Sequence, residues 1–235
     1  MKSYAIRPRL DQIDELTRGL RLPLPAIDMA YLDIIAESLS RAFDDVRTRH
    51  PVTVASGSEA EVTALLEARL NTLLEQDPFW GQLVMYVVRG KETVSFDGSH
   101  LEKRPDLSIY LSSRERNFPL VAEAKILDSH AAKTEAMYCD NGLCRFLVGD
   151  YAWANQEALM VAYVRDGSSI NGKLVPFLST AMKQIPPLYS VEALPSPGNG
   201  PGDRAWSRHE RSFAYHHQAP PTDPGAINIL HLWLS

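Results

Sequence analysis

Cysteine is scarce in this chain of 235 residues, which contains only Cys139 and Cys144. Two cysteines cannot build a disulfide scaffold, and they lack two of the ligands that a cysteine-rich zinc site needs. A hydrophobic core therefore has to stabilise the fold. Apolar residues make up 45% of the chain, an ordinary globular share, and the length is sufficient to bury a substantial core.

An excess of positive charge is also absent. Twenty-four lysines and arginines stand against 29 aspartates and glutamates, a net charge of −5. This balance argues against unspecific coating of nucleic acid but leaves room for a local basic groove. No apolar run approaches the ~18 residues of a membrane-spanning helix, and no apolar core follows the basic residues of segment 1–9. We therefore expect a soluble, cytoplasmic protein that has no membrane partner.

Signatures of several common enzyme classes are missing. The chain has no Gly-x-Ser-x-Gly nucleophile elbow, no Walker loop, no dinucleotide-binding glycine pattern and no His-Glu-x-x-His. Internal repeats and low-complexity runs are absent as well. Because domains usually contain about 100–200 residues, the length indicates one domain with additions.

The hydrophobic pattern changes its period along the chain. Helical spacing predicts helices over 26–49, 58–75, 129–138 and 172–185, and strand patterns are found at 83–88, 93–96, 106–111, 120–126, 158–164, 206–215 and 227–234. Proline and glycine predict a loop over 186–203. This order is typical of a mixed α/β (α+β) single domain, with an N-terminal helical segment, 1–55, packed on a core formed by 56–235.

Two neighbouring predicted strands carry charged side chains at one point of the sheet. Asp106 opens the strand 106–111, and Glu123 and Lys125 lie two positions apart on the otherwise apolar strand 120–126. Because side chains alternate along a strand, Glu123 and Lys125 share one face and Ala124 points to the other. The polar turn 112–117 joins the two strands. We therefore expect two carboxylates and an ammonium to converge.

Such a cluster has a specific physical chemistry. Neighbouring carboxylates repel one another, and their burial is costly unless a cation lies between them. Mg²⁺ prefers oxygen ligands and retains several water molecules. It would polarise a phosphoryl oxygen and generate hydroxide at neutral pH, while Lys125 would hold or deprotonate the attacking water or stabilise developing charge. The alternative interpretation is a surface salt-bridge cluster on an edge strand.

Pro105-Asp106 followed by Glu123-Ala124-Lys125 resembles the signature of the PD-(D/E)XK nuclease superfamily, which has the restriction-endonuclease-like fold. The proline, the hairpin spacing and the apolar strand around Glu123 carry the resemblance, which covers residues 56–165 in element order. It implies a central mixed sheet flanked by helices, and phosphodiester hydrolysis with Mg²⁺, for which Mn²⁺ would substitute. Asp106 and Glu123 would then be metal ligands and Lys125 a catalytic residue.

The resemblance also implies a glutamate on the helix before the hairpin. Candidates on the helix 58–75 are Glu59, Glu61 and Glu67. At about 100° per residue, Glu59 falls inside the leucine stripe and the other two fall at its edges. Glu59 is therefore the first choice for a further catalytic and metal-binding carboxylate, and Glu61 is the alternative. A second interpretation is that both glutamates only favour the positive N-terminus of the helix.

Three basic residues near the motif are candidates for nucleic-acid binding. The resemblance implies a helix that lines the substrate groove after the lysine strand, where Lys133 and Arg145 would contact phosphate. Arg104 directly precedes the Pro-Asp pair. The alternative for the segment around Arg145 is a solvated helix face beside a packed aromatic cluster.

Histidines offer a rival site. His209, the adjacent pair His216 and His217, and His231 all lie near the C-terminus of the sequence. Adjacent residues of a strand face opposite ways, so His216 and His217 cannot easily bind one metal ion. The stretch 207–211 has an alternative interpretation as a strand that faces phosphate.

The predicted function is Mg²⁺-dependent hydrolysis of nucleic acid, with a DNA endonuclease favoured, in a setting that the resemblance associates with restriction or phage defence. The acidic net charge fits poorly with strong autonomous DNA binding. A protein partner or the second protomer of a homodimer would then supply targeting. Two alternatives stay open: a binding or scaffold module with a spent site, and an RNA-directed nuclease.

Overall fold

The computed structural model describes residues 10–100, 103–215 and 220–235. Its α-helices are α1 (Leu10–Thr17), α2 (Met29–Arg49), α3 (Pro51–Ser56), α4 (Glu59–Gln76), α5 (Pro78–Leu83), α6 (Glu135–Tyr138), α7 (Cys144–Leu147) and α8 (Val175–Ala181). Its strands are β1 (Val84–Val88), β2 (Leu107–Leu111), β3 (Leu120–Leu127), β4 (Glu157–Val164), β5 (Val191–Pro197), β6 (Asp203–His209) and β7 (Ile227–Leu234). Short 3₁₀ or π turns are η1 (Ser129–Ala131), η2 (Cys139–Leu143), η3 (Ile170–Leu174) and η4 (Leu188–Ser190).

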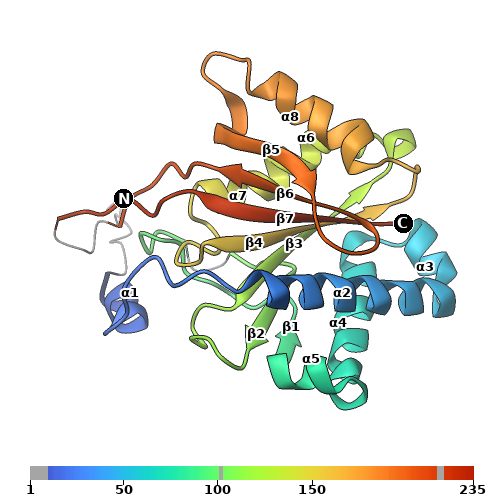
Figure 1. Cartoon of the computed structure of the whole chain (residues 1–235), viewed down its shortest axis with the longest axis horizontal. Helices are drawn as coiled ribbons and strands as arrows, with labels where there is room; N and C mark the ends of the chain where they lie inside the picture. Colours follow the sequence, from blue (N-terminus) through green and yellow to red (C-terminus); the bar gives the residue numbers. More distant parts are fainter. Residues whose placement is uncertain (1–9, 101–102, 216–219) are drawn as a thin grey trace, which may run out of the picture.

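The strands form one seven-stranded mixed sheet in the order β1-β2-β3-β4-β7-β6-β5 (Figure 1). The strands β1, β2 and β3 are antiparallel neighbours, whereas β3, β4 and β7 run parallel. The strands β6 and β5 complete the sheet with antiparallel pairing. The prediction of a mixed α/β fold with a central sheet is therefore confirmed.

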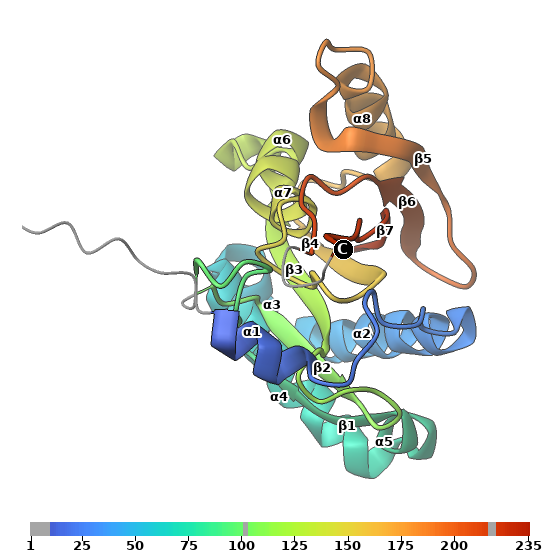
Figure 2. The ribbon, with the colours of Figure 1, turned by 90° about the vertical axis from the view of Figure 1, so that its left-hand side faces the viewer.

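Helices cover the two faces of the sheet in separate layers (Figure 2). One core contains the buried stripes of α2 and α4 and the strand residues that face them, among them Ala122, Ala124 and Ile126 of β3. The second core lies under α6, η2, α7 and α8, and it includes Val121 and Leu127 of β3. Because β3 alternates between these faces, Glu123 and Lys125 are on the same side as Val121.

Several element boundaries differ from the sequence prediction. Residues 93–96 form no strand and make only an isolated bridge between Thr93 and Lys103. The predicted loop 186–203 contains β5, an edge strand, which is where a strand tolerates proline. Pro51 follows the end of α2, as its sequence predicts, and it is also the first residue of α3.

The Asn141-Gly142 pair does not end a helix, contrary to its interpretation as a break. The chain passes from α6 through the π turn η2 into α7 without interruption. A Cβ atom on Gly142 would lie 2.5 Å from Cε of Met160. Gly142 therefore allows this turn to approach the sheet closely enough to bring α7 over β3 and β4.

None of the helices in the described part of the chain combines the length and the apolar character of a membrane span.

Candidate active site

The hairpin of β2 and β3 brings the predicted charged residues together. Leu107 pairs with Ala122, so Asp106, one residue before β2, lies beside Glu123 and Ala124. One carboxylate oxygen of Asp106 accepts a hydrogen bond from the backbone N–H of Ala124 at 2.8 Å. This bond fixes the Asp106 carboxylate against the strand that carries the other two charges.

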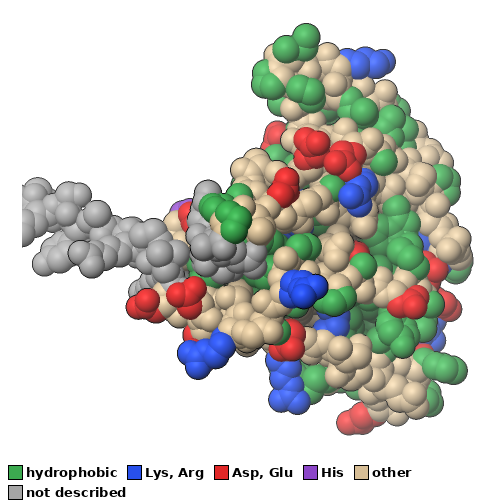
Figure 3. Space-filling view, turned by 60° about the vertical axis from the view of Figure 1, so that its left-hand side comes forward, with side chains coloured by type: hydrophobic (Ala, Val, Ile, Leu, Met, Phe, Trp, Pro, Cys, Tyr) green, Lys and Arg blue, Asp and Glu red, His purple; other side chains and the backbone are tan. Residues whose placement is uncertain are grey.

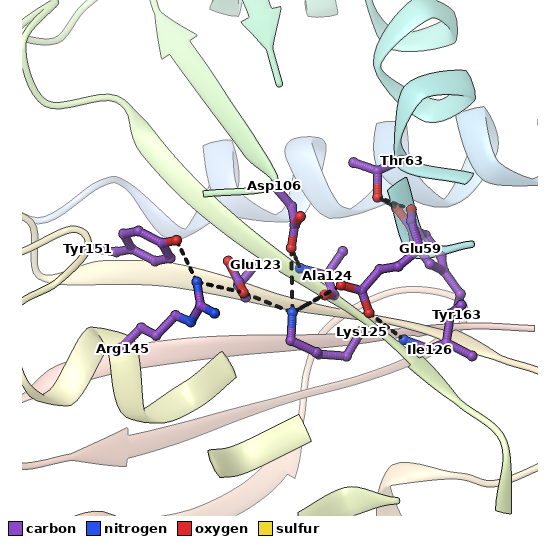
Figure 4. A network of polar contacts seen from close by, with 10 residues as sticks. All are labelled: Glu59, Thr63, Asp106, Glu123, Ala124, Lys125, Ile126, Arg145, Tyr151 and Tyr163. Atoms are coloured by element: carbon purple, nitrogen blue, oxygen red, sulfur yellow. Dashed lines mark hydrogen bonds and ion pairs between the residues drawn. The ribbon is translucent and has the colours of Figure 1, made fainter. Parts of the chain in front are cut away.

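Lys125 lies at the centre of the cluster (Figure 4). Its Nζ donates to Oε1 of Glu123 at 2.8 Å, to the carbonyl oxygen of Ala124 at 2.6 Å and to Oε1 of Glu59 at 3.2 Å. Oδ2 of Asp106 is 3.7 Å from the same nitrogen. Three carboxylates, from the start of α4, from the residue before β2 and from β3, therefore surround one ammonium.

The N-terminus of α4 delivers Glu59 to this cluster. Ser58 is the N-cap, and it forms a reciprocal capping box with Glu61, which determines where the helix begins. Glu59, one position into the helix, reaches β3, where its Oε2 accepts from the backbone N–H of Ile126 at 3.1 Å. Glu61 instead turns back onto Ser58, and Glu67 accepts from the backbone N–H of Arg89. The structure thus places Glu59 in the cluster and both other glutamates outside it.

Glu123 is the most deeply buried member of the cluster, with 3% of its side chain exposed. Burial, together with the neighbouring Asp106 carboxylate, raises the pKa of Glu123 to about 7, even though Lys125 and Arg145 act in the opposite direction. Within the described residues, its buried Oε2 atom has no hydrogen-bond partner. A buried carboxylate oxygen without a partner is an available ligand for a cation.

Lys125 keeps its charge in this environment. Burial acts to lower its pKa, but Glu123, Asp106 and Glu59 together outweigh burial and raise the pKa above the ordinary lysine value. An ammonium of this kind donates hydrogen bonds and stabilises negative charge, and it is a poor proton acceptor at neutral pH.

Arg145 extends the cluster from α7. Its Nη1 lies 3.6 Å from Oε1 of Glu123 and donates to the Tyr151 hydroxyl at 2.7 Å (Figure 4). Burial, together with the nearby Glu123, raises the pKa of Tyr151 to about 12, so the phenol stays protonated. Among the described residues, no acceptor contacts the proton of the Tyr151 hydroxyl. Sequence reasoning missed Tyr151, because it lies in an irregular segment whose spacing carries no signal.

The other two predicted nucleic-acid contacts lie outside the cluster. Arg104 is largely exposed and donates to Glu92 at 2.5 Å. Lys133 follows η1, where its backbone pairs with that of Asp128. The structure therefore groups Arg145 with the carboxylates and leaves Arg104 and Lys133 on flanking segments.

The two rival histidines that the structure describes, His209 and His231, do not form an accessible site. His209 and His231 are fully buried, and their Nε2 atoms both lie 2.7 Å from the buried Ser207 hydroxyl. Nδ1 of His231 meets the Tyr138 hydroxyl at 2.9 Å. Within the stretch 207–211, Ser207 and His209 therefore face the interior and not a phosphate, while the half-exposed Arg208 pairs with Glu192. His216 and His217 lie outside the described residues.

The buried histidines predict how stability depends on pH. Burial lowers the pKa of His209 to about 4, whereas an unfolded histidine titrates near 6.5. The unfolded chain thus binds more protons between these values, and the free energy of unfolding should decrease by up to about 3 kcal/mol as the pH falls from 6.5 to 4. Urea unfolding of wild type and His209→Gln at pH 7 and 4.5 measures this. Protonation of Glu123 changes the free energy of unfolding in the opposite direction over the same pH range, and it does so in both proteins. The difference between wild type and His209→Gln therefore isolates the contribution of His209. Identical pH dependence of the two proteins would contradict the prediction.

The donor set of the cluster suits a hard divalent cation. Asp106 and Glu123 supply carboxylate oxygens, Ala124 supplies a carbonyl, and Glu123 has an unused oxygen. Mg²⁺ is usually held by one or two carboxylates together with water and substrate phosphates. Among the described residues, no three His, Cys, Asp or Glu side chains form a ready-made metal site. The Lys125 ammonium occupies the centre of the cluster instead, which shows that this position favours positive charge.

Comparison with protein-family models, curated proteins and solved structures finds no match for this chain.

Proposed function

We propose that the chain is a Mg²⁺-dependent nuclease, with DNA as the favoured substrate, and that the cluster of Asp106, Glu123, Lys125 and Glu59 is its active site. The observation that carries the proposal is the buried Glu123 carboxylate, which faces Lys125 and Asp106 and has one oxygen free. A cluster this costly to bury is difficult to explain as a surface salt bridge.

The order of elements supports the restriction-endonuclease-like fold as part of this proposal. A helix that carries a glutamate, α4, precedes an antiparallel hairpin that carries the aspartate and the Glu-x-Lys segment. A helical segment and a strand parallel to β3 follow. This is the arrangement that the sequence resemblance implies over residues 56–165.

Each residue of the cluster would have a distinct role. Asp106 and Glu123 would hold the metal ion, with the Ala124 carbonyl close by. When bound, the metal would supply Lewis-acid activation of the phosphodiester. Lys125, which its three carboxylates keep charged, would orient the attacking water through a donated hydrogen bond and stabilise negative charge on the phosphoryl oxygens. Glu59 would position Lys125.

Arg145 and Tyr151 would bind the phosphate beside the cluster. The Arg145 guanidinium is partly exposed, with 36% of the side chain accessible, and its contact with Tyr151 holds it towards Glu123. A guanidinium and a phenol proton are both donors to a non-bridging phosphate oxygen. This contact would orient the scissile group without taking part in proton transfer.

The surface charge bears on how a substrate would be recruited. On the face shown in Figure 3, lysine and arginine side chains are interspersed with aspartate and glutamate side chains. A surface of mixed sign gives little of the sequence-independent attraction that a strongly basic surface would provide. A protein partner or a second protomer would therefore supply part of the affinity for nucleic acid.

A cleavage assay tests the proposed function. Plasmid, linear and single-stranded DNA and RNA are incubated with Mg²⁺, Mn²⁺ or EDTA. We expect cleavage of at least one DNA substrate with either metal and none with EDTA. Cleavage of RNA alone would favour the RNA-directed alternative. Binding without cleavage under every condition would support the scaffold alternative and contradict the nuclease.

Glu59→Gln should weaken the apparent affinity for Mg²⁺ roughly tenfold, the scale of losing a residue that positions the ligands around a metal. Glu59 contacts both Lys125 and the strand that carries Glu123. The matched control is Glu67→Gln on the same helix, because the Glu67 carboxylate bonds to Arg89, away from the cluster. Titration of cleavage rate against Mg²⁺ measures the change, and equal midpoints for the two variants would remove Glu59 from the site.

A further inference from the structure

A cavity of about 220 Å³ lies beside the carboxylate cluster. Its floor includes Tyr110 of β2 and Val121 of β3. Val121 is two residues before Glu123, and Tyr110 is four residues after Asp106, so all four side chains are on the same face of the sheet. The cavity is therefore a continuation of the surface on which the candidate active site lies.

The walls of the cavity come from segments far apart in the sequence. The helix α1, the segment 91–94 after β1, the residues before β3 and the segment 150–155 all contribute. Trp153 and Phe118 pack edge to face, with ring centroids 5.1 Å apart, and make the lining aromatic. Tyr110 adds aromatic surface, although its ring is stacked on Tyr86 and lies under Nζ of Lys91. Polar groups also line it: the amides of Gln12 and Asn117, which have no partner in the described part of the chain, and the carboxylate of Asp150.

The size and chemistry of this lining suit a single heteroaromatic ring system. Sites for drug-sized ligands usually measure about 300–1,000 Å³, and this cavity is smaller. Aromatic side chains stack on the face of a nucleobase, while amide and carboxylate groups hydrogen-bond its edge. Asn117 and Gln12 can both donate and accept, and Asp150 accepts.

Two further observations connect the cavity with the cluster. Ser108 lies on β2 between Asp106 and Tyr110 on the same face, and its fully buried hydroxyl has no partner among the described residues. This hydroxyl lies between the cluster and the cavity along β2 and does not itself line the cavity. Lys91 and Lys103 lie beside the cavity, where Nζ of Lys91 donates to the Tyr110 hydroxyl at 2.5 Å and Lys103 pairs with Asp150 at 2.9 Å. Both ammonium groups place positive charge beside the cavity, which favours the approach of the charged backbone of a nucleic acid.

We propose that this cavity binds one unstacked nucleobase of the substrate strand, which places a neighbouring phosphodiester at Asp106 and Glu123. The inference rests on the proposed nuclease function and specifies its substrate. The strand must release a base from its stack, which costs least where the base is unpaired. Single strands, bulges, mismatches and frayed ends are therefore the preferred substrates, and an intact duplex is a poor one.

Binding of oligonucleotides in EDTA tests the proposal without cleavage. The first probe is a DNA duplex with one unpaired adenine, and the second is the same duplex with an abasic nucleotide at that position. Because each stacked base contributes substantially to single-strand binding, wild type should bind the first probe about tenfold more tightly. Asn117→Trp, which fills the mouth of the cavity, should abolish this preference. Asn199→Trp, in the exposed loop between β5 and β6, is the matched control and should retain it.

The outcomes separate this inference from the proposed function. Equal affinity of wild type for the two probes, or a preference that survives in Asn117→Trp, would overturn the base subsite. Cleavage with Mg²⁺ but without any preference for the unpaired base would leave the nuclease intact and remove the subsite. A base preference in EDTA without cleavage under any metal condition would support the subsite and contradict the nuclease.

Mononucleotides distinguish a substrate strand from a free nucleotide as the source of the base. dAMP is titrated by calorimetry into wild type and Asn117→Trp. If the cavity binds a base within a strand, dAMP should bind only weakly and should compete with the unpaired-adenine probe. Tight binding of dAMP that Asn117→Trp removes, with no binding of either duplex, would overturn the strand as occupant and identify a free-nucleotide site.

Discussion

Lys125→Ala is expected to lower the rate of nucleic-acid cleavage by at least ~100-fold, the scale of losing a positioned electrostatic group. The reason is geometric: Nζ of Lys125 is the shared partner of Glu123, Glu59 and the Ala124 carbonyl, and no other ammonium contacts these groups in the described residues. Initial rates with saturating Mg²⁺ measure the effect.

The Lys125→Ala variant should still fold. Glu123 has a pKa of about 7 even beside the ammonium, so without Lys125 it takes up a proton instead of remaining a buried charge. Circular dichroism and a thermal melt check this. The matched control is Lys183→Ala on an exposed segment, which should cleave like wild type. A folded Lys125→Ala with wild-type turnover would contradict the role of the lysine.

Mg²⁺ should stabilise the folded protein, and Asp106→Asn should remove most of this stabilisation. A ligand that binds only the folded state contributes RT ln(1 + [L]/Kd), about 1.4 kcal/mol at ten times Kd. For a domain of this size, the melting temperature should rise by about 3–6 °C. Asparagine can still accept from the Ala124 N–H, so the metal-free variant should be at least as stable as metal-free wild type.

Four thermal melts measure this second effect: wild type and Asp106→Asn, each with EDTA and with millimolar Mg²⁺. The variant removes one of the negative charges beside Glu123, so loss of the Mg²⁺ shift without loss of metal-free stability isolates metal binding from folding. An equal Mg²⁺ shift in both proteins would mean that Asp106 is not a ligand.

Local periodicity was sufficient to predict the parts of the cluster that lie on one element. The two-residue period of β3 places Glu123 and Lys125 on one face, and the helical projection places Glu59 on the core-facing side of α4. The hairpin follows from a polar turn between two apolar strands, which also brings Asp106 alongside. These relations depend on residues within about 20 positions of each other or on a single helix face.

The remaining features depend on tertiary contacts that sequence patterns do not encode. Proline-rich β5 forms because the edge of the sheet leaves room for it, and its sequence alone predicts a loop. Tyr151 contacts Arg145 at the cluster on a segment that Gly142 lets pack closely against Met160 of the sheet. The cavity beside the cluster needs α1, which is about 100 residues away from β2 in the chain. Its lining could not be predicted from spacing.

The most direct test of the candidate active site is the initial rate of DNA cleavage by wild type and Glu123→Gln, each with Mg²⁺ and with EDTA. Glutamine preserves the size of the buried side chain and removes the charge that would hold the metal. Wild type should cleave only with Mg²⁺, and Glu123→Gln should be inactive in both conditions while Glu67→Gln retains wild-type rates. Cleavage by wild type in EDTA, or equal Mg²⁺-dependent rates for wild type and Glu123→Gln, would contradict a metal-dependent nuclease site at this cluster.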